Sequence, residues 1–214
     1  MKLSIYIKFI FIYVVGAILS FVFVTEGTSR MIMNYLTTKE ADALYREAAL
    51  LSNDYARDYY RSRTASSLEL VYIHLSALDT YLNADIWMID IDGKVILESG
   101  NSLVRPDTST HIIEDFDPAG FGTSYYMTGD FFGEFKQDTL SVIAPINYNY
   151  RVRGYLVIHT AMSSLEAEKE NILNIMYITL AVLLVLALAA LLIVGFILYY
   201  PLKKICLLYT SPSP

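Results

Sequence analysis

Two long stretches without a charged side chain frame this sequence, and every acidic residue lies between them. The stretches cover residues 9–24 and 175–200. All 22 acidic residues fall between Thr25 and Asn171. Long uncharged segments are typical of helices that cross a bilayer, where a charged side chain is costly. The pattern predicts two membrane spans that enclose an acidic folded domain.

The second stretch is long enough for a membrane-spanning helix. Its 26 residues, rising about 1.5 Å each, span about 39 Å, whereas the hydrocarbon core of a bilayer is about 30 Å thick. Tyr177, Tyr199 and Tyr200 lie near its ends, where aromatic rings favour the headgroup layer. A buried core helix is the alternative, but such helices rarely run this far without a polar face. We therefore expect a transmembrane helix over residues 172–200.

The first stretch has 16 residues and allows two interpretations. In one, residues 5–7 extend the apolar run, the Lys8 side chain reaches back to the headgroups, and the segment stays as an anchor. In the other, Lys2 and Lys8 form the basic end of a cleaved signal peptide. The run exceeds a usual signal core, and residues 21–27 offer no clear small-x-small cleavage site. The sequence favours a retained transmembrane helix over residues 9–24, in contact with membrane lipid.

Basic residues outside the acidic region predict the orientation of the two spans. Lys2, Lys8, Lys203 and Lys204 are the only charged residues there, whereas the middle region holds 12 basic and 22 acidic residues, a net charge of −10. Short basic flanks stay on the cytoplasmic side of a membrane. We therefore expect both termini, including residues 1–8, in the cytoplasm and residues 25–171 outside it.

The enclosed region of 147 residues has the size of one domain with its own core. The only cysteine, Cys206, lies beyond the second span, so this domain has to fold without disulfides. Its acidity disfavours nucleic acid as a partner and disfavours docking on anionic lipid. It contains no Gly-x-Ser-x-Gly, phosphate-binding loop or His-Glu-x-x-His motif. We therefore expect no catalytic residues, no metal and no resident cofactor in this chain.

Helical patterns open and close this domain. No Gly or Pro occurs from Met31 to Arg61, and apolar residues recur there at three- or four-residue spacing along one stripe: Ala41, Leu44, Ala48, Leu51, Tyr55 and Tyr59. The sequence Ser-Ser-Leu-Glu at residues 66–69 predicts the capped start of a second helix, and its repetition at 163–166 predicts the start of a last one. The last helix meets no Gly or Pro until Gly195, so we expect it to run directly into the second span.

Strand patterns occupy the middle of the domain. Residues 86–91 are rich in strand formers, Asp92-Gly93 is a strong turn signal, and residues 94–98 return as the partner strand. Residues 139–146 and 152–159 predict a second hairpin that turns at 147–150, whereas residues 99–138 are rich in Gly and Pro and predict loops. The expected fold class is α+β, with an antiparallel sheet and a long amino-terminal helix, flanked by two transmembrane helices.

The order of helix, helix, hairpin, irregular middle, hairpin and final helix resembles the PAS-like (Cache-type) extracytoplasmic sensor domains of bacterial receptors. Residues 86–95, with their Asp-Gly turn, look like the first hairpin of those domains. Residues 200–205 resemble the opening of a HAMP linker, where a proline starts a short helix; the matching positions are Pro201, Leu202, Lys203, Lys204 and Ile205. Together these features are similar to the amino-terminal sensor half of a membrane sensor histidine kinase of a two-component system.

This resemblance implies a homodimer in a bacterial plasma membrane. The outer domain would sense a small molecule or a physical cue, and residues 201–205 would relay the signal to a kinase domain and its response regulator. ATP and magnesium would bind only to that kinase domain, which is not in this chain. Residues 206–214 depart from the HAMP pattern, because Pro212 and Pro214 cannot continue a helix. We expect a non-native tail there, at the end of a truncated reading frame.

Two other interpretations stay open. One keeps the receptor but gives it the output of a chemoreceptor or of a cyclic-dinucleotide enzyme, and only sequence beyond residue 205 distinguishes these. The other is a stand-alone protein with two spans, whose outer domain binds a partner or forms a scaffold. An envelope hydrolase has no supporting residues.

The densest aromatic and polar stretch, residues 123–132, is the candidate ligand site. In the resembled family the ligand lies against the sheet, beneath the segment between the hairpins. Tyr125, Tyr126 and Asp130 could therefore line a small-molecule pocket, with Trp87 as its floor. Tyrosines would supply ring faces and hydroxyls, and the aspartate could bind an amine. Alternatively, these aromatic residues fill the core or pair across strands.

The histidines carry further hypotheses. His111 with Glu114 or Asp115 offers metal-binding atoms, but the spacing fits no closed metal loop, and a solvated acidic turn is the favoured interpretation. His74 and His159 could titrate near neutral pH and sense it, although a structural role is the commoner one.

Overall fold

The computed structural model describes residues 5–62, 64–100 and 111–209. It divides into two compact units, Met33–Glu168 on the one hand and Met1–Ile32 with Lys169–Pro214 on the other. In chain order the elements are α1 (Ile5–Leu51), the π-helical turn η1 (Ser52–Ala56), α2 (Arg57–Ser62), α3 (Ala65–Leu82), β1 (Asp85–Asp90), β2 (Val95–Glu98), the 3-10 helix η2 (Pro118–Phe121), β3 (Tyr126–Gly129), β4 (Thr139–Tyr148), β5 (Arg151–Ala161) and α4 (Met162–Tyr209).

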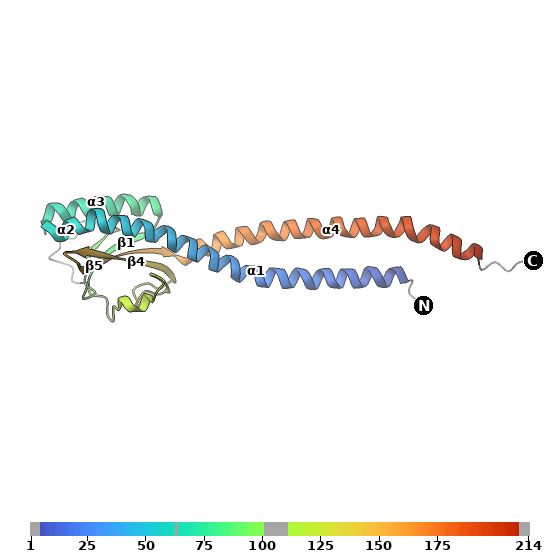
Figure 1. Cartoon of the computed structure of the whole chain (residues 1–214), viewed down its shortest axis with the longest axis horizontal. Helices are drawn as coiled ribbons and strands as arrows, with labels where there is room; N and C mark the ends of the chain where they lie inside the picture. Colours follow the sequence, from blue (N-terminus) through green and yellow to red (C-terminus); the bar gives the residue numbers. More distant parts are fainter. Residues whose placement is uncertain (1–4, 63, 101–110, 210–214) are drawn as a thin grey trace, which may run out of the picture. The chain divides into compact units, whose positions relative to one another are not determined.

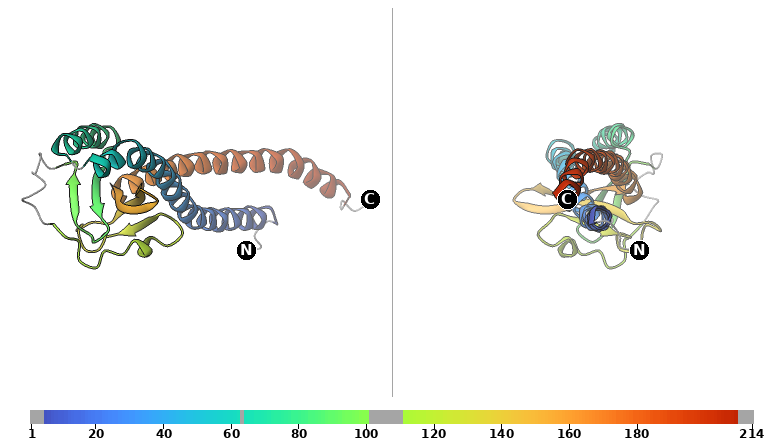
Figure 2. Two further views of the ribbon diagram at one scale, coloured as in Figure 1. Left: turned by 60° about the vertical axis from the view of Figure 1, so that its left-hand side comes forward. Right: turned by 90° about the vertical axis from the view of Figure 1, so that its right-hand side faces the viewer.

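The unit Met33–Glu168 is built on a five-stranded antiparallel sheet with strand order β2-β1-β5-β4-β3. Figure 1 shows α2 and α3 over one face of this sheet and the segment that contains η2 over the other, and the views in Figure 2 agree. The predicted α+β class, the antiparallel sheet and the long amino-terminal helix are therefore confirmed.

Alternation along the strands divides the core between the two faces. On one face Trp87, Ile89, Ile143 and Val157 form a cluster with Ile113, Val95, Phe121 and Phe131. Their alternates on β1 and β5, such as Met88 and Ile158, are fully buried on the face where the helices lie. Burial on both faces explains why these strands read as continuous apolar runs rather than as alternating ones.

The predicted apolar stripe of α1 is correct up to Leu51 and then shifts by one residue. Tyr55 is 37% exposed and Tyr59 is half-buried, whereas Ala56 and Tyr60 are buried in their place. The cause is η1, because a π-helical turn takes up one extra residue and rotates the following side chains relative to an α-helix. The prediction that Tyr55 and Tyr59 continue the stripe was wrong for this reason.

Both predicted helix starts lie slightly off. The N-cap of α3 is Thr64, whose hydroxyl accepts a hydrogen bond from the Ser67 backbone N–H at 3.3 Å while the Ser67 hydroxyl accepts one from the Thr64 N–H at 3.3 Å. The capping box thus begins two residues before Ser66, and the helix begins at Ala65. The last helix, α4, begins at Met162, which leaves Ser163 inside it.

The hairpins follow the predicted turn chemistry. Gly93 has a φ of 79°, which the Asp-Gly turn requires, and the Asp90 N–H donates to the Lys94 carbonyl at 2.8 Å. In the second hairpin Asn149 and Tyr150 both have positive φ, 52° and 60°, so the turn is shorter than residues 147–150 and the strands are longer. The strand β3 lies in the region predicted as loops, because its four residues carry no alternating pattern.

In the other unit, α1 and α4 each contain a segment long and apolar enough to cross a membrane. The apolar side chains there are largely exposed, as at Phe11 and Phe23. Phe21 and Tyr177 bring ring centroids of the two helices to 6.0 Å. The backbone of α4 continues through Pro201 to Tyr209, so residues 201–205 do not begin a separate helix. The HAMP assignment stays a prediction, and the side chains from residue 198 onward and the whole of 210–214 lie outside the described residues.

Candidate functional site

One face of the sheet is covered by residues 111–135, which include η2 and β3. The segment is fixed at its start by a bridge between Ile112 and Lys94. Further on, the Asp117 side chain caps η2 by accepting the Ala119 N–H at 2.8 Å, and Pro118 stands at the first helical position, which suits a proline. These local features place the aromatic side chains of the segment against the strands.

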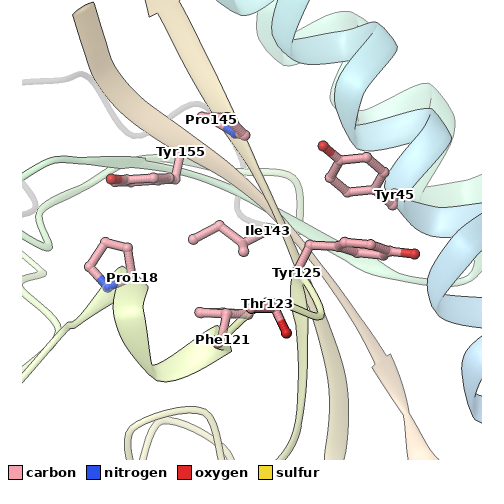
Figure 3. Close-up of a pocket in the computed structure, with 9 residues that line it drawn as sticks. Tyr45, Pro118, Phe121, Thr123, Tyr125, Ile143, Pro145 and Tyr155 are labelled. Carbon is pink, nitrogen blue, oxygen red and sulfur yellow. The ribbon is translucent and has the colours of Figure 1, made fainter.

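A hollow of about 200 Å³ lies at the edge of the sheet, just before β3 begins and where β4 continues beyond it. It is lined by residues of α1, of the segment around η2 and of the two long strands: Tyr45, Pro118, Phe121, Gly122, Thr123, Tyr125, Ile143, Pro145 and Tyr155. Figure 3 shows Ile143 between the η2 residues on one side and the paired rings of Tyr45 and Tyr125 on the other. Ligand pockets for drug-sized molecules hold about 300 Å³ or more, so this hollow suits only a small molecule.

Tyr125 connects this hollow to α1. Its hydroxyl donates a hydrogen bond to the Asp42 carboxylate, and its ring centroid lies 4.3 Å from that of Tyr45. The hydrogen bond to Asp42 is the main cause that raises the Tyr125 pKa above its ordinary value. Burial raises the pKa of Tyr155 across the hollow as well. Both phenols therefore stay neutral at physiological pH and present hydroxyl groups rather than charges.

The backbone at Tyr125 is unusual. Its φ of 50° lies in the left-handed region, which a bulky side chain rarely adopts. The same residue closes the ladder, because its carbonyl accepts the Ile143 N–H at 2.9 Å. A strained residue held by tertiary contacts is typical of binding sites and switches.

The structure distributes the four predicted site residues over three places. Tyr125 lines the hollow, and the Tyr126 ring centroid lies 6.2 Å from that of Tyr125 without lining it. Trp87 is 7% exposed and belongs to the aromatic core. Asp130 is exposed, and its backbone carbonyl accepts the Phe135 N–H at 3.0 Å. As ligand-binding residues all four stay predictions.

Sequence reasoning missed Asp42, Tyr45 and Tyr155. Asp42 and Tyr45 each follow a buried stripe residue of α1 directly, so they lie at the border of the stripe, where polar side chains can still reach the sheet. A search for tyrosine and carboxylate at such border positions would have found them. Nothing in the sequence indicates that Asp42 accepts a hydrogen bond from Tyr125, since these two residues lie 83 positions apart.

The three histidines have distinct surroundings. His159 is 2% exposed, with Nδ1 at 2.8 Å from the Ser141 hydroxyl, and burial lowers its pKa to about 3. Such a group stays neutral near pH 7, which favours the structural interpretation over a pH sensor. His74 stacks on Tyr55 with ring centroids 3.9 Å apart. His111 pairs with Glu134 at 2.8 Å, and no group of three or more His, Cys, Asp or Glu within the described ranges is placed to hold a metal ion.

No family model and no curated protein matches the chain. Among solved structures it is similar to the sensor domain of the V. cholerae histidine kinase DctB, with 18% identity and a TM-score of 0.49, over 66% of this chain and 57% of that one. It is also similar to the sensory domain of the Campylobacter jejuni chemoreceptor Tlp3 (CcmL) with isoleucine bound, with 17% identity and a TM-score of 0.43, over 67% of this chain and 63% of that one. The chain thus spans less than two thirds of the length of either domain. A likeness at this level assigns neither a ligand nor an output.

Proposed function

We propose that this chain is the input half of a transmembrane signal receptor, in which the unit Met33–Glu168 senses a small molecule or a physical cue. One observation carries the proposal. The helices that begin and end this unit, α1 and α4, are the same two helices that contain membrane-length apolar segments. A change inside the unit can therefore reach the membrane along continuous helices.

Contacts of α1 with the hollow support a relay through this helix. Asp42 accepts the hydrogen bond of Tyr125, and the Ser52 hydroxyl at the π-helical turn donates to the Pro145 carbonyl at 2.6 Å. Both Tyr125 and Pro145 line the hollow. A ligand that displaces the Tyr125 ring breaks one of the two connections and keeps the other. It shifts the population of α1 positions only if it prefers one of them.

The finer parts of the proposal come from the charge pattern of the sequence and from its resemblance to membrane sensor kinases. Both termini lie in the cytoplasm of a bacterial cell, residues 25–171 lie outside its plasma membrane, and two copies form a homodimer. Residues 201–205 begin a HAMP linker to a histidine kinase domain, where ATP and magnesium bind and from which a response regulator is phosphorylated. A chemoreceptor or cyclic-dinucleotide enzyme output is the alternative, and the gene sequence downstream of residue 205 distinguishes these outputs.

Cysteine labelling tests the topology. In a Cys206→Ser background, Gln137→Cys places a thiol at an exposed position of the folded unit. A membrane-impermeant maleimide added to intact cells should label this variant, while the native Cys206 of the parent should react only after lysis. The opposite labelling pattern contradicts the receptor proposal, because the folded unit would then face the cytoplasm.

Thermal-shift screening of the full chain in detergent, with amino acids, dicarboxylates, amines and polyols, tests the hollow. A compound that binds there should stabilise the parent and Tyr126→Phe, and its apparent affinity should fall at least tenfold in Tyr125→Phe and in Tyr45→Ala. Tyr126→Phe is the matched control, since this neighbouring tyrosine does not line the hollow. Equal stabilisation of all four proteins would exclude the hollow as the ligand site.

A further inference from the structure

Two buried polar atoms on the face of the sheet that residues 111–135 cover have no hydrogen-bond partner within residues 5–62, 64–100 and 111–209. They are the indole Nε1 of Trp87 and the Nε2 of His159, in side chains that are 7% and 2% exposed. Folded proteins satisfy nearly all buried polar atoms, so each exception needs an explanation, such as a ligand that supplies the missing bonds. Here two exceptions lie together, since the ring centroids are 4.8 Å apart.

The strand register explains why these atoms share one face. Trp87 on β1 pairs with Val157 on β5, and His159 follows Val157 by two residues, which returns it to the same side of the sheet. Two phenylalanines from the covering segment close the place. The Phe131 ring centroid lies 4.3 Å from that of His159 and 5.9 Å from that of Trp87. The Phe135 ring centroid lies 4.9 Å from that of His159 and 5.4 Å from that of Trp87.

The hydrogen-bond network assigns the proton of His159. The Thr139 hydroxyl donates to the Gly129 carbonyl at 3.0 Å, and the hydroxyl oxygens of Thr139 and Ser141 lie 3.3 Å apart. The proton of Thr139 is thereby used, and we therefore assign Ser141 as the donor to Thr139 and as the acceptor from His159 Nδ1 at 2.8 Å. This arrangement leaves Nε2 as an acceptor with a free lone pair. The place thus offers one N–H donor and one nitrogen acceptor, both uncharged.

Phe131 is held over these atoms by a strained turn. Phe131 and Phe132 have φ values of 46° and 56°, and Gly133 follows with 81°. Two consecutive bulky residues in the left-handed region are unfavourable, so the turn persists only because the packing of Phe131, which is 0% exposed, holds it. Withdrawal of this ring would relieve the strain and open a ring-sized space next to the two unpartnered atoms. A ligand that fills such a space would make this open state the major one.

We propose that Phe131 closes a binding site for a small neutral molecule that carries a hydroxyl or primary amide group on an aromatic or aliphatic body. Its polar group accepts from Trp87 Nε1–H and donates to His159 Nε2, and its apolar body replaces the Phe131 ring against Phe135 and Val157. A charged molecule does not suit the site, because it would lose its hydration without meeting an opposite charge. This site adjoins the hollow at Tyr125, since Phe121, which lines the hollow, has its ring centroid 6.2 Å from that of Phe131. It does not depend on the function proposed for the hollow.

Benzyl alcohol and toluene are the probes, because they share a ring and differ in the hydroxyl group. The chain has one tryptophan and 18 tyrosines, so fluorescence of the full chain in detergent, excited at a wavelength selective for tryptophan, reports on Trp87 alone. Benzyl alcohol should bind the parent weakly, since the closed state dominates. In Phe131→Ala it should bind at least tenfold more tightly. If this variant does not fold, Phe131→Leu opens the site partly and replaces it.

Variants of His159 in the Phe131→Ala background distinguish the proposal from a purely apolar cavity. His159→Leu should weaken benzyl alcohol at least tenfold and leave toluene unchanged, while His159→Gln should retain part of the benzyl alcohol affinity. Each probe partitions into the detergent micelle to the same extent with every variant. This loss therefore does not affect the ratio of its affinities between variants. Tyr125→Phe, which alters only the hollow, should change neither affinity.

A second measurement needs no variant. The indole N–H of Trp87 gives a single resonance in a ¹H–¹⁵N spectrum, and benzyl alcohol should move it downfield as a hydrogen bond forms. Three outcomes overturn the proposal: equal dependence of both probes on His159, no gain in affinity on removal of the Phe131 ring, or an indole N–H that already donates to a buried water in the parent.

Discussion

Replacement of His159 by leucine should remove a specific part of the pH dependence of stability. In the unfolded chain this imidazole takes up a proton below its ordinary pKa of 6.5, whereas burial lowers its pKa to about 3 in the folded protein. Between these values the unfolded state binds one more proton than the folded state. The free energy of unfolding therefore falls as the pH decreases through this window, and the loss is complete below the folded pKa.

The size of the effect follows from the pKa difference. Each pKa unit corresponds to about 1.4 kcal/mol, so the folded parent should lose about 2 kcal/mol through His159 between about pH 7 and about pH 5. The full difference approaches about 5 kcal/mol near pH 3, where carboxylates contribute as well. Urea unfolding of the full chain in detergent, followed by the fluorescence of Trp87, measures the quantity, because this ring lies against His159. His159→Leu should lack this contribution.

Ser141→Ala is the matched control. It removes the hydrogen bond to Nδ1 and lowers the absolute stability, but it leaves the imidazole buried, and burial is what lowers the His159 pKa. Its pH dependence should therefore parallel that of the parent. If the curves of the parent and His159→Leu ran parallel between about pH 7 and about pH 5 instead, the folded protein would accept the proton, and the buried, uncharged environment of His159 would be refuted.

Three further changes test the packing of the folded unit. Gly154→Ala should destabilise it by about 1–3 kcal/mol in urea unfolding, because an added Cβ would lie 2.5 Å from a carbonyl oxygen of β1. Gly120→Ala is the control, since its Cβ would meet only ordinary contacts, and it should change the free energy of unfolding by less than about 0.5 kcal/mol. An equal loss of unfolding free energy in both variants would contradict the reasoning. Deletion of Asn53 should convert η1 into regular helix and lower the free energy of unfolding by less than about 2 kcal/mol. Deletion of Arg46 should lower it by more than about 3 kcal/mol, because it rotates buried side chains off the sheet. Similar losses in both variants would argue against a π-helical turn. Burial and two neighbouring carboxylates raise the pKa of Asp85, so Asp85→Asn should slightly raise the Tm at neutral pH, and a lower Tm would show that the carboxylate is needed.

Much of the fold is accessible from the sequence, because its signals are local. The Asp-Gly turn at Gly93 specifies the first hairpin by backbone conformation alone, and continuous apolar runs identify the buried strands β1, β4 and β5. The amino-terminal helix follows from its stripe, which is correct as far as Leu51. The predicted helix register is wrong beyond Leu51, because η1 takes up one extra residue. The Ser52 hydroxyl of this turn bonds to β4, a distant contact that the local sequence does not indicate.

The candidate sites were less accessible. Composition points to residues 123–132, and Tyr125 does line a hollow, whereas Trp87, the predicted floor of the same pocket, belongs to the aromatic core; the pocket itself stays a prediction. Tyr125 lies at the edge of β4, whereas Trp87 lies on β1 under the aromatic cluster. Composition identifies a segment, but only the strand order β2-β1-β5-β4-β3 tells which of its residues meet which strand.

Three positions where local rules fail lie at the two candidate sites, whereas another, Tyr150 with a φ of 60°, lies in the β4–β5 turn. Ser52 begins the π-helical turn and contacts a wall of the hollow, Tyr125 lines it with a φ of 50°, and Phe131 covers the Trp87–His159 pair with a φ of 46°. A π-helical turn and bulky residues in the left-handed region are each unfavourable by themselves, so tertiary contacts have to stabilise them. Sequences tend to break local rules where function needs a second arrangement. A ligand that releases Phe131 or Tyr125 would relax the backbone at that residue, and this stored strain favours a change of state over a rigid pocket at both places.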